Sequence, residues 1–460
     1  MKQVAQNYRS GELVVLDVPP PACRPGGVIV RTLYSLISTG TEMMKVSEAR
    51  LSLIGKARAR PDQARKAVET VAQLGPVAAY QKVMNRLDSY TPLGYSLCGV
   101  VEQVGAGATE FREGQLVACA GNDHALHAEI NWVPTNLCVP VPDGLDAQLA
   151  AFATVGAIAM HGVRRAEVGL GDTACVVGLG LVGQLVVQLL VAGGARVVGL
   201  DVVDERCRLA EANGAVACAP PTPDGLDQIE RVVRDLTAGL GADHIVLAAG
   251  GSSDGPVHAA ARLARDRARI VDIGKCRLDL PWNEYYEKEL DVRFSRSYGP
   301  GRYDTTYEID GVDYPAGYVR WTERRNLACF LDLAARGVVD VRSLTSEVFP
   351  IDDAVEVYGR LNDGSLRGVG FLFGYPTTAS DAPASGAKAT KAVVAPAPLT
   401  RTRTPRQGGL RLGFIGAGNY ASSMLLPHLA RAEGVELAKV VTQTSLSATN
   451  ARRKFGFAEA

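Results

Sequence analysis

The sequence predicts an α/β protein made of a β-barrel-like domain, a doubly wound parallel-sheet domain and, after a linker, a partial second strand–turn–helix unit. Three observations carry this prediction. Residues 1–145 alternate short β-type runs with Gly and Pro turns. From residue 146 short apolar strands alternate with helices, a pattern typical of a parallel sheet with right-handed crossovers. A stretch rich in Thr, Ala, Ser, Pro, Lys and Arg then precedes residue 409.

The first 145 residues are predicted to form the β-barrel-like domain, with strands near 27–33, 98–104 and 115–119. A segment of helical character from Met43 to Ser89 interrupts them. Its basic residues are Lys45, Arg50, Lys56, Arg58, Arg60, Arg65, Lys66, Lys82 and Arg86. Two interpretations stay open for it: a solvated helical hairpin, or a basic rim for a phosphorylated or nucleotide-linked substrate.

Residues 146–300 are predicted to form the parallel-sheet domain, because strand-like runs at 173–177, 196–201, 243–248 and 268–274 are separated by helical stretches. The apolar run at 181–192 is too short to span a bilayer, so it is predicted to be a buried helix. Further on, a helix is expected from about Glu323 to Arg336 and a closing strand at 369–373. Residues 375–408 are predicted to be a flexible linker, and 409–460 the partial third unit.

A glycine pattern follows the 173–177 strand and opens the 181–192 helix. Gly178 permits a tight turn, Gly180 lets the backbone approach a pyrophosphate, and Gly183 lets the helix pack against the strand. Free N–H groups at the helix N-terminus favour phosphate binding. The pattern alone is a weak signal, but its place between a strand and a helix predicts a dinucleotide site.

Asp201 ends the next strand and decides the predicted cofactor. A carboxylate there can accept hydrogen bonds from both ribose hydroxyls of NAD and would repel the 2′-phosphate of NADP, so the cofactor is predicted to be NAD. Arg206 is near enough to stack on adenine. The complete predicted cofactor set is Gly178, Gly180, Leu181, Val182, Gly183, Asp201, Arg206, Ala249 and Gly274.

The composition limits the kinds of partner that the protein is expected to bind. A formal net charge of zero provides no overall field to attract nucleic acid or anionic membranes, so a small-molecule partner is expected. The nine cysteines are scattered without a Cys-x-x-Cys pair, which indicates neither a zinc knuckle nor a redox pair. Dispersed thiols and the lack of a signal-peptide pattern at the N-terminus predict a cytoplasmic protein.

Residues 10–374 resemble the medium-chain dehydrogenase/reductase superfamily, the alcohol-dehydrogenase-like enzymes. The resemblance rests on Ser38–Glu42, Pro92–Val101, His127–Glu129 and the cofactor turn. It implies a GroES-like barrel domain, a Rossmann domain and a return of residues 301–374 to the barrel, with the active site in the cleft between the domains. Protomers of many members pair into dimers, so a homodimer is a further expectation.

The sequence departs from the zinc-dependent members at each metal position. Thr39 stands where they carry Cys, Tyr95 stands where they carry His, and 151–153 hold only Ala, Phe and Ala. No catalytic zinc is therefore predicted. Another group must handle the proton, and the candidates are Thr41, Tyr95 and His124. The open alternatives are a turn-capping hydroxyl for Thr41, a packing ring for Tyr95 and a surface histidine for His124.

The segment from Leu412 to Ala421 resembles the opening of the glucose-fructose oxidoreductase/inositol dehydrogenase family, which binds NAD(P) with Gly-x-Gly-Asn turns. Because the sequence ends at Ala460, before that family's catalytic Lys and substrate sheet, we expect this unit to have no activity of its own. The order of units resembles bacterial bi-domain oxidoreductases of polysaccharide synthesis. The Tyr- and Arg-rich residues 296–323 suit sugar hydroxyls and phosphates, or form an ordered loop with buried tyrosines.

Three functional hypotheses follow. The first is an NAD-dependent, zinc-independent oxidoreductase that acts on a hydroxyl or carbonyl of a polyol, sugar or sugar nucleotide. The second is a nucleotide-binding protein that has lost catalysis, and the third is a zinc enzyme with atypical ligands.

Overall fold

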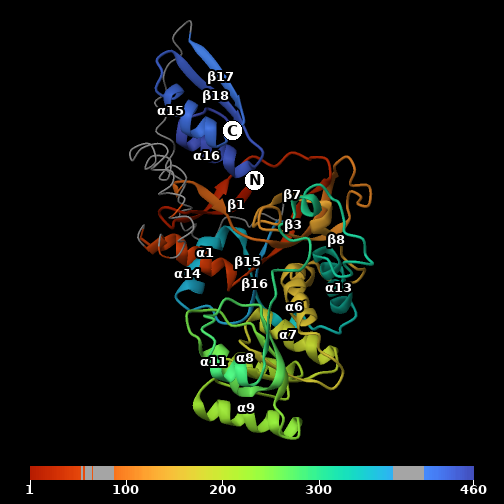
Figure 1. Ribbon diagram of the computed structural model, residues 1–460. Helices are drawn as coiled ribbons and strands as arrows, with labels where there is room; N and C mark the ends of the chain where they lie inside the picture. The colour runs from red at the N-terminus through yellow and green to blue at the C-terminus, as the bar shows by residue number, and fades with distance from the viewer. Residues whose placement is uncertain (53–54, 57, 59–64, 66–86, 377–408) are drawn as a thin grey trace, which may run out of the picture.

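The computed structural model describes residues 1–52, 55–56, 58, 65, 87–376 and 409–460. Three bodies follow one another in Figure 1: the third unit, the barrel domain and the parallel-sheet domain. Among the helices of the described ranges, none combines the length and apolar character that crossing a bilayer requires.

The barrel domain is built from two sheets. A three-stranded sheet has the order β2-β1-β4, and a larger sheet runs β15-β16-β3-β5-β6-β8, with β7 also paired to β3. The strands are β1 (Lys2–Asn7), β2 (Leu13–Asp17), β3 (Gly27–Ile37), β4 (Tyr90–Pro92), β5 (Ser96–Val104), β6 (Leu116–Ala120), β7 (Ile130–Pro134), β8 (Cys138–Pro140), β15 (Thr345–Pro350) and β16 (Gly370–Gly374). The strands predicted near 27–33, 98–104 and 115–119 are therefore confirmed as parts of β3, β5 and β6.

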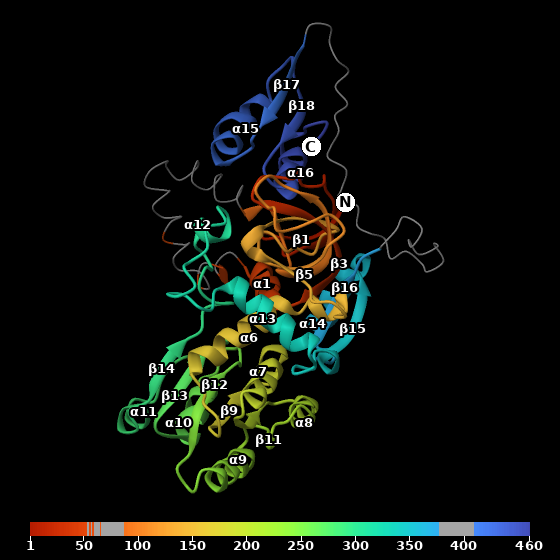
Figure 2. The same cartoon turned by 90° about the vertical axis from the view of Figure 1, so that its right-hand side faces the viewer.

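The second domain contains a six-stranded parallel sheet, seen with β14, β13, β12 and β9 side by side in Figure 2. Its order, β11-β10-β9-β12-β13-β14, is that of the Rossmann fold. The strands are β9 (Thr173–Val177), β10 (Arg196–Leu200), β11 (Ala217–Ala219), β12 (Ala242–Leu247), β13 (Ala264–Asp272) and β14 (Asp291–Phe294). The helices are α7 (Leu181–Ala192), α8 (Asp204–Ala212), α9 (Pro223–Leu236), α10 (Gly255–Leu263) and α11 (Trp282–Glu287).

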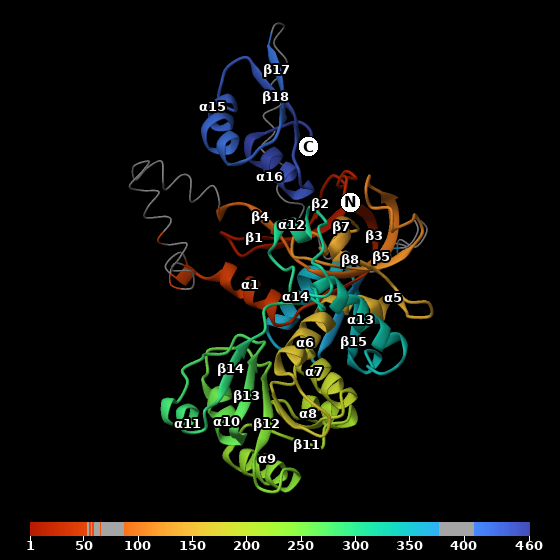
Figure 3. The same cartoon turned by 45° about the vertical axis from the view of Figure 1, so that its right-hand side comes forward.

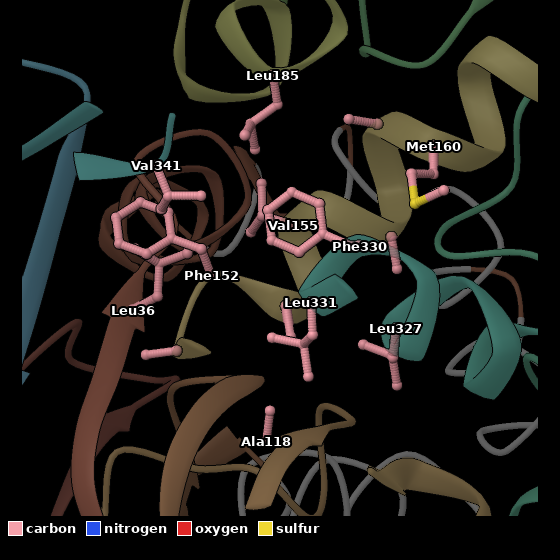
Figure 4. Packing of buried hydrophobic residues seen from close by; sticks show 14 of the residues in the cluster. Leu36, Ala118, Phe152, Val155, Met160, Leu185, Leu327, Phe330, Leu331 and Val341 are labelled. Carbon is pink, nitrogen blue, oxygen red and sulfur yellow. The ribbon is translucent and has the colours of Figure 1, made fainter. Parts of the chain in front are cut away.

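Helix α6 (Ala153–Ala166) joins the two domains. One buried cluster runs from Leu36 and Ala118 of the barrel through α6 to Leu185 of α7, and Figure 4 shows these side chains around Phe330. Phe330 belongs to α13 (Glu323–Ala335), which crosses α6 so closely that a Cβ on Gly156 would lie 2.3 Å from the Phe330 ring. The barrel and the Rossmann domain therefore share one core.

The chain returns to the barrel after β14, as Figure 3 shows for α13, β15 and α14 (Ala354–Asn362). Strand β16 pairs with β3, and Tyr375 continues this contact by donating its backbone N–H to Leu33 O. Tyr375 is buried, so its assignment to the linker was wrong; it belongs to the barrel. From residue 377 to 408 the predicted linker lies outside the described residues. So do most residues of the basic segment 43–89, although Thr41–Arg50 form helix α1.

The third unit has two parallel strands, β17 (Leu410–Ile415) and β18 (Val435–Val441), with α15 (Leu426–Leu429) and α16 (Ser445–Phe455). Helix α16 contacts the barrel: the Asn450 side chain accepts a hydrogen bond from Tyr90 N and donates one to Tyr90 O. Beside them Arg453 lies over the Tyr90 ring and pairs with Asp88.

Glu323 is an unusual feature at the first turn of α13. It is fully buried, and neither of its carboxyl oxygens has a hydrogen-bond partner. Burial raises its pKa to about 9, with a further contribution from the nearby carboxylate of Glu308. Its neighbour Arg302, which pairs with Glu308, opposes this shift only in part. Glu323 is therefore a neutral carboxylic acid at pH 7.

This neutral acid predicts a pH dependence of stability. In the folded chain Glu323 keeps its proton up to about pH 9, whereas the unfolded chain releases it near the ordinary value of 4.5. The folded state thus holds one more proton between these values, and its free energy of unfolding falls by up to about 1.4 kcal/mol per pH unit from this group. Urea unfolding of Glu323→Gln between pH 5 and 9 should show a flatter pH dependence than the parent chain.

The exposed Glu347 provides a matched control, because Glu347→Gln makes the same chemical change on the surface. The Glu347→Gln chain should keep the parent slope. Equal slopes for Glu323→Gln and the parent chain would show that Glu323 is ionised in the folded protein.

Candidate active site and cofactor cleft

A cleft runs between the barrel and the carboxyl ends of the Rossmann strands. One wall is formed by the Ser38–Met44 segment and Tyr95 of the barrel, and the other by the Gly178 turn and the ends of β10, β12 and β13. In doubly wound sheets, ligands bind at this edge, where the strand order reverses between β9 and β12. The cleft thus joins the predicted cofactor turn to two of the three predicted catalytic residues.

The glycines of the turn are required by close backbone contacts. Gly178 has a φ of +94°, and a Cβ there would lie 2.6 Å from Ala249 N. A Cβ on Gly183 would lie 1.9 Å from Gly178 O, so α7 can approach β9 this closely only with glycine. Gly180 faces open space in the cleft, where its missing side chain leaves the backbone accessible.

The start of α7 fits a dinucleotide pyrophosphate. Leu181 and Val182 line the cleft and occupy the first turn of the helix, whose N–H groups have no partners within the helix. These N–H groups and the positive end of the helix dipole favour a phosphate. Ala249 and Gly274 lie on the same cleft wall. A Cβ on Gly274 would lie 2.1 Å from Ala249 O, so these two strand ends also touch. Gly183 does not line the cleft; it packs behind the turn.

Asp201 lies at the end of β10 and binds the turn directly. One carboxylate oxygen accepts the N–H of Leu179 at 2.6 Å, and the other accepts the N–H of Val203 at 2.9 Å. Arg206 stands 3.7 Å from the second oxygen and is about one-third exposed. Asp201 is itself nearly buried yet lines the cleft, so its carboxylate is fixed before any ribose arrives.

The opposite wall carries hydroxyl groups. Tyr95 and Ser38 are buried, and Thr41, the first residue of α1, is partly exposed; all three line the cleft. Burial raises the pKa of Tyr95 to about 12 and the nearby charge of Glu42 adds to this, while hydrogen bonding with Ser38 and Thr41 opposes it. The three hydroxyls therefore form one cluster in which Tyr95 keeps its proton at neutral pH.

The structure does not bring His124 to this cluster. The described residues that line the cleft do not include it, and its ring packs edge-on against Trp132 at 5.6 Å. Burial lowers its pKa to about 4. A partly buried histidine that is neutral at pH 7 and lies outside the cleft does not suit the general acid/base role for which it was a candidate.

The side chains at this site do not fit a zinc ion. Within the described ranges, no three His, Cys, Asp or Glu side chains gather where they could hold a metal. Thr39 and Tyr95 occupy the positions at which the resemblance would place ligands, and Ala151–Ala153 are buried without donor atoms. The hydroxyl cluster offers none of the thiolate, imidazole or carboxylate ligands that zinc prefers.

The Tyr- and Arg-rich segment reaches the cleft only at Ser297, whose φ of +52° is strained for a residue with a side chain. Tyr298 and Tyr307 are buried, and Arg302 pairs with Glu308. Tyr303 and Tyr318 are exposed, so only part of the segment is the ordered loop with buried tyrosines that the sequence left as one alternative.

Three residues beside the cleft were missed by the sequence analysis. Glu42, His127 and Tyr358 form a fully buried hydrogen-bonded group directly behind the hydroxyl cluster. His127 lies in a bend before β7. Glu42 lies far along the chain from both His127 and Tyr358, so no short sequence pattern could have linked the three.

Comparison with known proteins agrees with this architecture. A family described as zinc-binding dehydrogenase matches residues 182–309. D-xylulose reductase A of Aspergillus oryzae is 25% identical over 303 residues, covering 59% of this chain and 77% of that protein. D-guloside 3-dehydrogenase of Escherichia coli (strain K12) is 27% identical over 267 residues, covering 58% of this chain and 72% of that protein.

Two solved structures share the fold. Alcohol dehydrogenase TADH from Thermus sp. ATN1 superposes with a TM-score of 0.60 at 18% identity, covering 82% of this chain and all of that one. The short chain alcohol dehydrogenase rspB from E. coli CFT073, solved with NADH, superposes with a TM-score of 0.60 at 17% identity. The match covers 81% of this chain and 99% of that one.

Residues 182–309 are thus similar to the zinc-binding dehydrogenase family, and the chain as a whole shares its fold with solved alcohol dehydrogenases. The predicted α/β fold, with a barrel domain and a parallel-sheet Rossmann domain, is confirmed. The prediction of an oxidoreductase is confirmed by the named dehydrogenases and reductases among its relatives.

The Asp201 geometry generates a prediction about cofactor choice. Asp201→Ala removes the predicted ribose acceptor and the charge that repels a 2′-phosphate, so the dissociation constant for NADH should rise by about tenfold or more. The affinity for NADPH should stay the same or increase. Titration of nicotinamide fluorescence measures both constants.

Asp201 also holds the turn through Leu179, so the NADPH measurement separates two effects. If affinity for both dinucleotides falls equally, Asp201 acts only on the turn and does not select the cofactor. Asp235→Ala, an exposed acid-to-alanine change near the other end of α9 and away from the cleft, should leave both constants unchanged.

Proposed function

We propose that this chain is an NAD(H)-dependent oxidoreductase that interconverts a CH–OH group and a carbonyl on a polyol, sugar or sugar nucleotide, without a catalytic zinc ion. The observation that carries the proposal is the cleft itself. It has a dinucleotide-binding turn on one wall and a hydroxyl cluster, with no zinc ligands, on the other. The hydroxyl of a substrate between these walls would meet Tyr95 rather than a metal.

NAD is proposed as the cofactor over NADP because the fixed Asp201 carboxylate occupies the ribose-binding end of the turn. Arg206 lies 3.7 Å from Asp201 and could bind a 2′-phosphate, but its guanidinium already faces that carboxylate. When bound, NAD supplies the hydride chemistry of the reaction.

Tyr95 and Thr41 are proposed to handle the proton. In the reducing direction Tyr95 Oη would donate its proton to the carbonyl oxygen and be reprotonated through Thr41. In the oxidising direction it would receive the hydroxyl proton as its own proton passes to Thr41. Thr41, which hydrogen-bonds with Tyr95 and is partly exposed, would return the proton to or from solvent. We leave His124 out of this scheme because it lies away from the cleft.

The proposed substrate class rests on the relatives, whose names are those of enzymes acting on D-xylulose and a D-guloside. A cluster of three hydroxyls suits a polyhydroxylated substrate because each can both donate and accept a hydrogen bond. Lys275 and Arg367 also line the cleft and suit the phosphates of a dinucleotide or sugar nucleotide.

We further propose that residues 409–460 are the opening of a second dinucleotide-binding unit of the glucose-fructose oxidoreductase/inositol dehydrogenase type. Its support is the strand–turn arrangement of β17, Gly416 with a φ of +91°, and the parallel partner β18. With the resemblance to bi-domain oxidoreductases, this favours a role in polysaccharide synthesis. The nine free thiols suit a reducing cytoplasm.

A homodimer through the edge of the Rossmann sheet is also proposed. Among the described strands only β13 pairs with β14, so one edge of β14 is open. Three aromatic side chains lie exposed beside it: Trp282, Tyr286 and Phe294, with exposed fractions of 72%, 68% and 62%. Trp282 and Tyr286 stack on each other, which makes a rigid apolar surface for a partner.

The catalytic proposal predicts that the full chain oxidises NADH in the presence of a ketose or a keto-sugar. Tyr95→Phe should lower kcat by about 100-fold or more, because the phenyl ring keeps the packing but has no proton to give. Absorbance at 340 nm follows the reaction. The NADH dissociation constant should not change, since Tyr95 lies across the cleft from the turn.

Tyr34→Phe is a matched control, because Tyr34 is a partly buried barrel tyrosine that does not line the cleft. Full activity of Tyr95→Phe would refute its role. Binding of NADH without turnover of any sugar or polyol would favour the inactive nucleotide-binding protein.

The dimer proposal predicts a mass of twice that of the chain by light scattering. Phe294→Asp should give monomers because it places a charge in the apolar interface. Leu240 is a comparably exposed apolar residue on the loop between α9 and β12, so Leu240→Asp should leave the dimer intact. A monomeric parent chain would contradict the proposal.

A further inference from the structure

A buried network lies behind the hydroxyl cluster of the cleft. His127 Nε2 lies 2.9 Å from Glu42 Oε2, and the same oxygen accepts the hydroxyl of Tyr358. His127 Nδ1 is hydrogen-bonded to Ser35 Oγ at 2.7 Å, and Ser35 Oγ is also hydrogen-bonded to the Tyr375 hydroxyl at 2.8 Å. The side chains of Glu42 and His127 are completely buried.

Ser35, His127 and Glu42 are hydrogen-bonded in the same sequence as the serine, histidine and acid of a nucleophilic triad, but they do not form one. Ser35 is fully buried and its hydroxyl is also bonded to Tyr375, so no substrate can reach it. Ser35 does not line the cleft. A buried and fully bonded network of this kind instead fixes the geometry and charge of whatever it contacts.

What the network contacts is the turn that carries the hydroxyl cluster. Glu42 Oε1 accepts the backbone N–H of Ser38 at 2.9 Å, and Glu42 N donates to Ser38 O at 3.0 Å. These two bonds close the loop on which Ser38 and Thr41 stand. Both hydroxyls are thereby held against Tyr95.

Glycine at position 94 connects Tyr95 to the same network. Gly94 has a φ of +96°, and a Cβ there would lie 2.4 Å from His127 N and 3.0 Å from its ring. His127 is held in turn by N–H donation to Leu93 O at 2.9 Å. The residue before Tyr95 therefore packs directly on the histidine that binds Glu42.

Glu42 is ionised in this setting. Burial alone would raise its pKa, but the charge and hydrogen bond of His127, with the bonds from Tyr358 and Ser38, hold the pKa of Glu42 below its ordinary value. Because the carboxylate can only accept, His127 Nε2 carries a proton. The titratable groups that face Glu42 are His127, Tyr358 of α14, Tyr375 after β16, and Tyr95.

We propose that Glu42, anchored by His127 and Tyr358, is the positioning residue of the proton-handling site: it fixes the Ser38–Thr41 turn and places a buried negative charge beside the Tyr95 hydroxyl. Burial is the larger cause of the raised pKa of Tyr95, and the Glu42 charge adds to it, so both favour the protonated phenol that would donate to a substrate. This role rests on the proposed function, but its electrostatic part can be measured without turnover.

The test is a pair of variants that separate charge from structure. Glu42→Gln removes the charge and keeps the shape, whereas Tyr358→Phe removes one hydrogen bond and keeps the charge. In Glu42→Gln the phenol of Tyr95, titrated by absorbance at 295 nm against Glu42→Gln/Tyr95→Phe, should ionise about one pH unit lower than in the parent chain. Tyr358→Phe should leave that midpoint in place.

Kinetics provide a second readout. With NADH and a carbonyl substrate, the rate of Glu42→Gln should begin to fall at a pH about one unit lower than the rate of the parent chain does, with kcat lowered there and KM for NADH unchanged. Asp172→Asn is the matched control, because Asp172 also bonds a histidine, His244, at 2.9 Å but lies away from the cleft. It should leave the Tyr95 midpoint and the pH profile unaltered.

The results separate failure of this inference from failure of the proposed function. A folded Glu42→Gln chain whose Tyr95 midpoint does not move, or an equal shift in Tyr358→Phe, overturns the positioning role. A parent chain that binds no NADH overturns the proposed function, while the titration of Tyr95 still decides whether Glu42 acts on it.

Discussion

Close backbone contact at the glycine turn is the constraint on which the cofactor cleft depends. Gly183 touches Gly178 O, Gly178 touches Ala249, and Gly274 touches Ala249 O, so the ends of β9, β12 and β13 and the start of α7 meet at one place. A side chain at any of these glycines would push the helix from the sheet. Because they meet, the N–H groups of α7 open directly into the cleft opposite the barrel.

The barrel contributes a wall whose chemistry differs from that of a zinc enzyme. Where the resemblance would place metal ligands, the chain presents hydroxyl groups. Near them, the Glu42 carboxylate is hydrogen-bonded to the His127 imidazole and to the backbone N–H of Ser38. A Glu–His pair that is buried and satisfied cannot also coordinate an ion without losing those bonds. Its charge acts on its neighbours instead, and the nearest hydroxyl wall is that of Tyr95, Ser38 and Thr41.

The shared core explains why the two walls face each other. Helix α6 packs against both α7 and α13, so the return of the chain to the barrel is part of the same cluster that supports the cofactor helix. Gly156 permits Phe330 to lie directly on α6. The position of the cleft is thus supported by a packed cluster that spans both domains.

Local patterns predicted the Rossmann half of the molecule well. The 181–192 run became α7 with those bounds, because an apolar helix between glycines is a local signal. The Glu42 network was out of reach, since its members are 85 and 316 residues apart and no short pattern links them. The burial of Glu323 was equally hidden, because an acid in the first turn of a helix is ordinarily a surface residue.

The most direct test of the central claim is a crystal structure of the full chain with NADH. The account predicts the pyrophosphate at the N–H groups of Leu181 and Val182, the adenosine ribose on Asp201, and the nicotinamide ring facing Tyr95 and Thr41. A dinucleotide bound elsewhere, or a nicotinamide turned away from the hydroxyl wall, would contradict it.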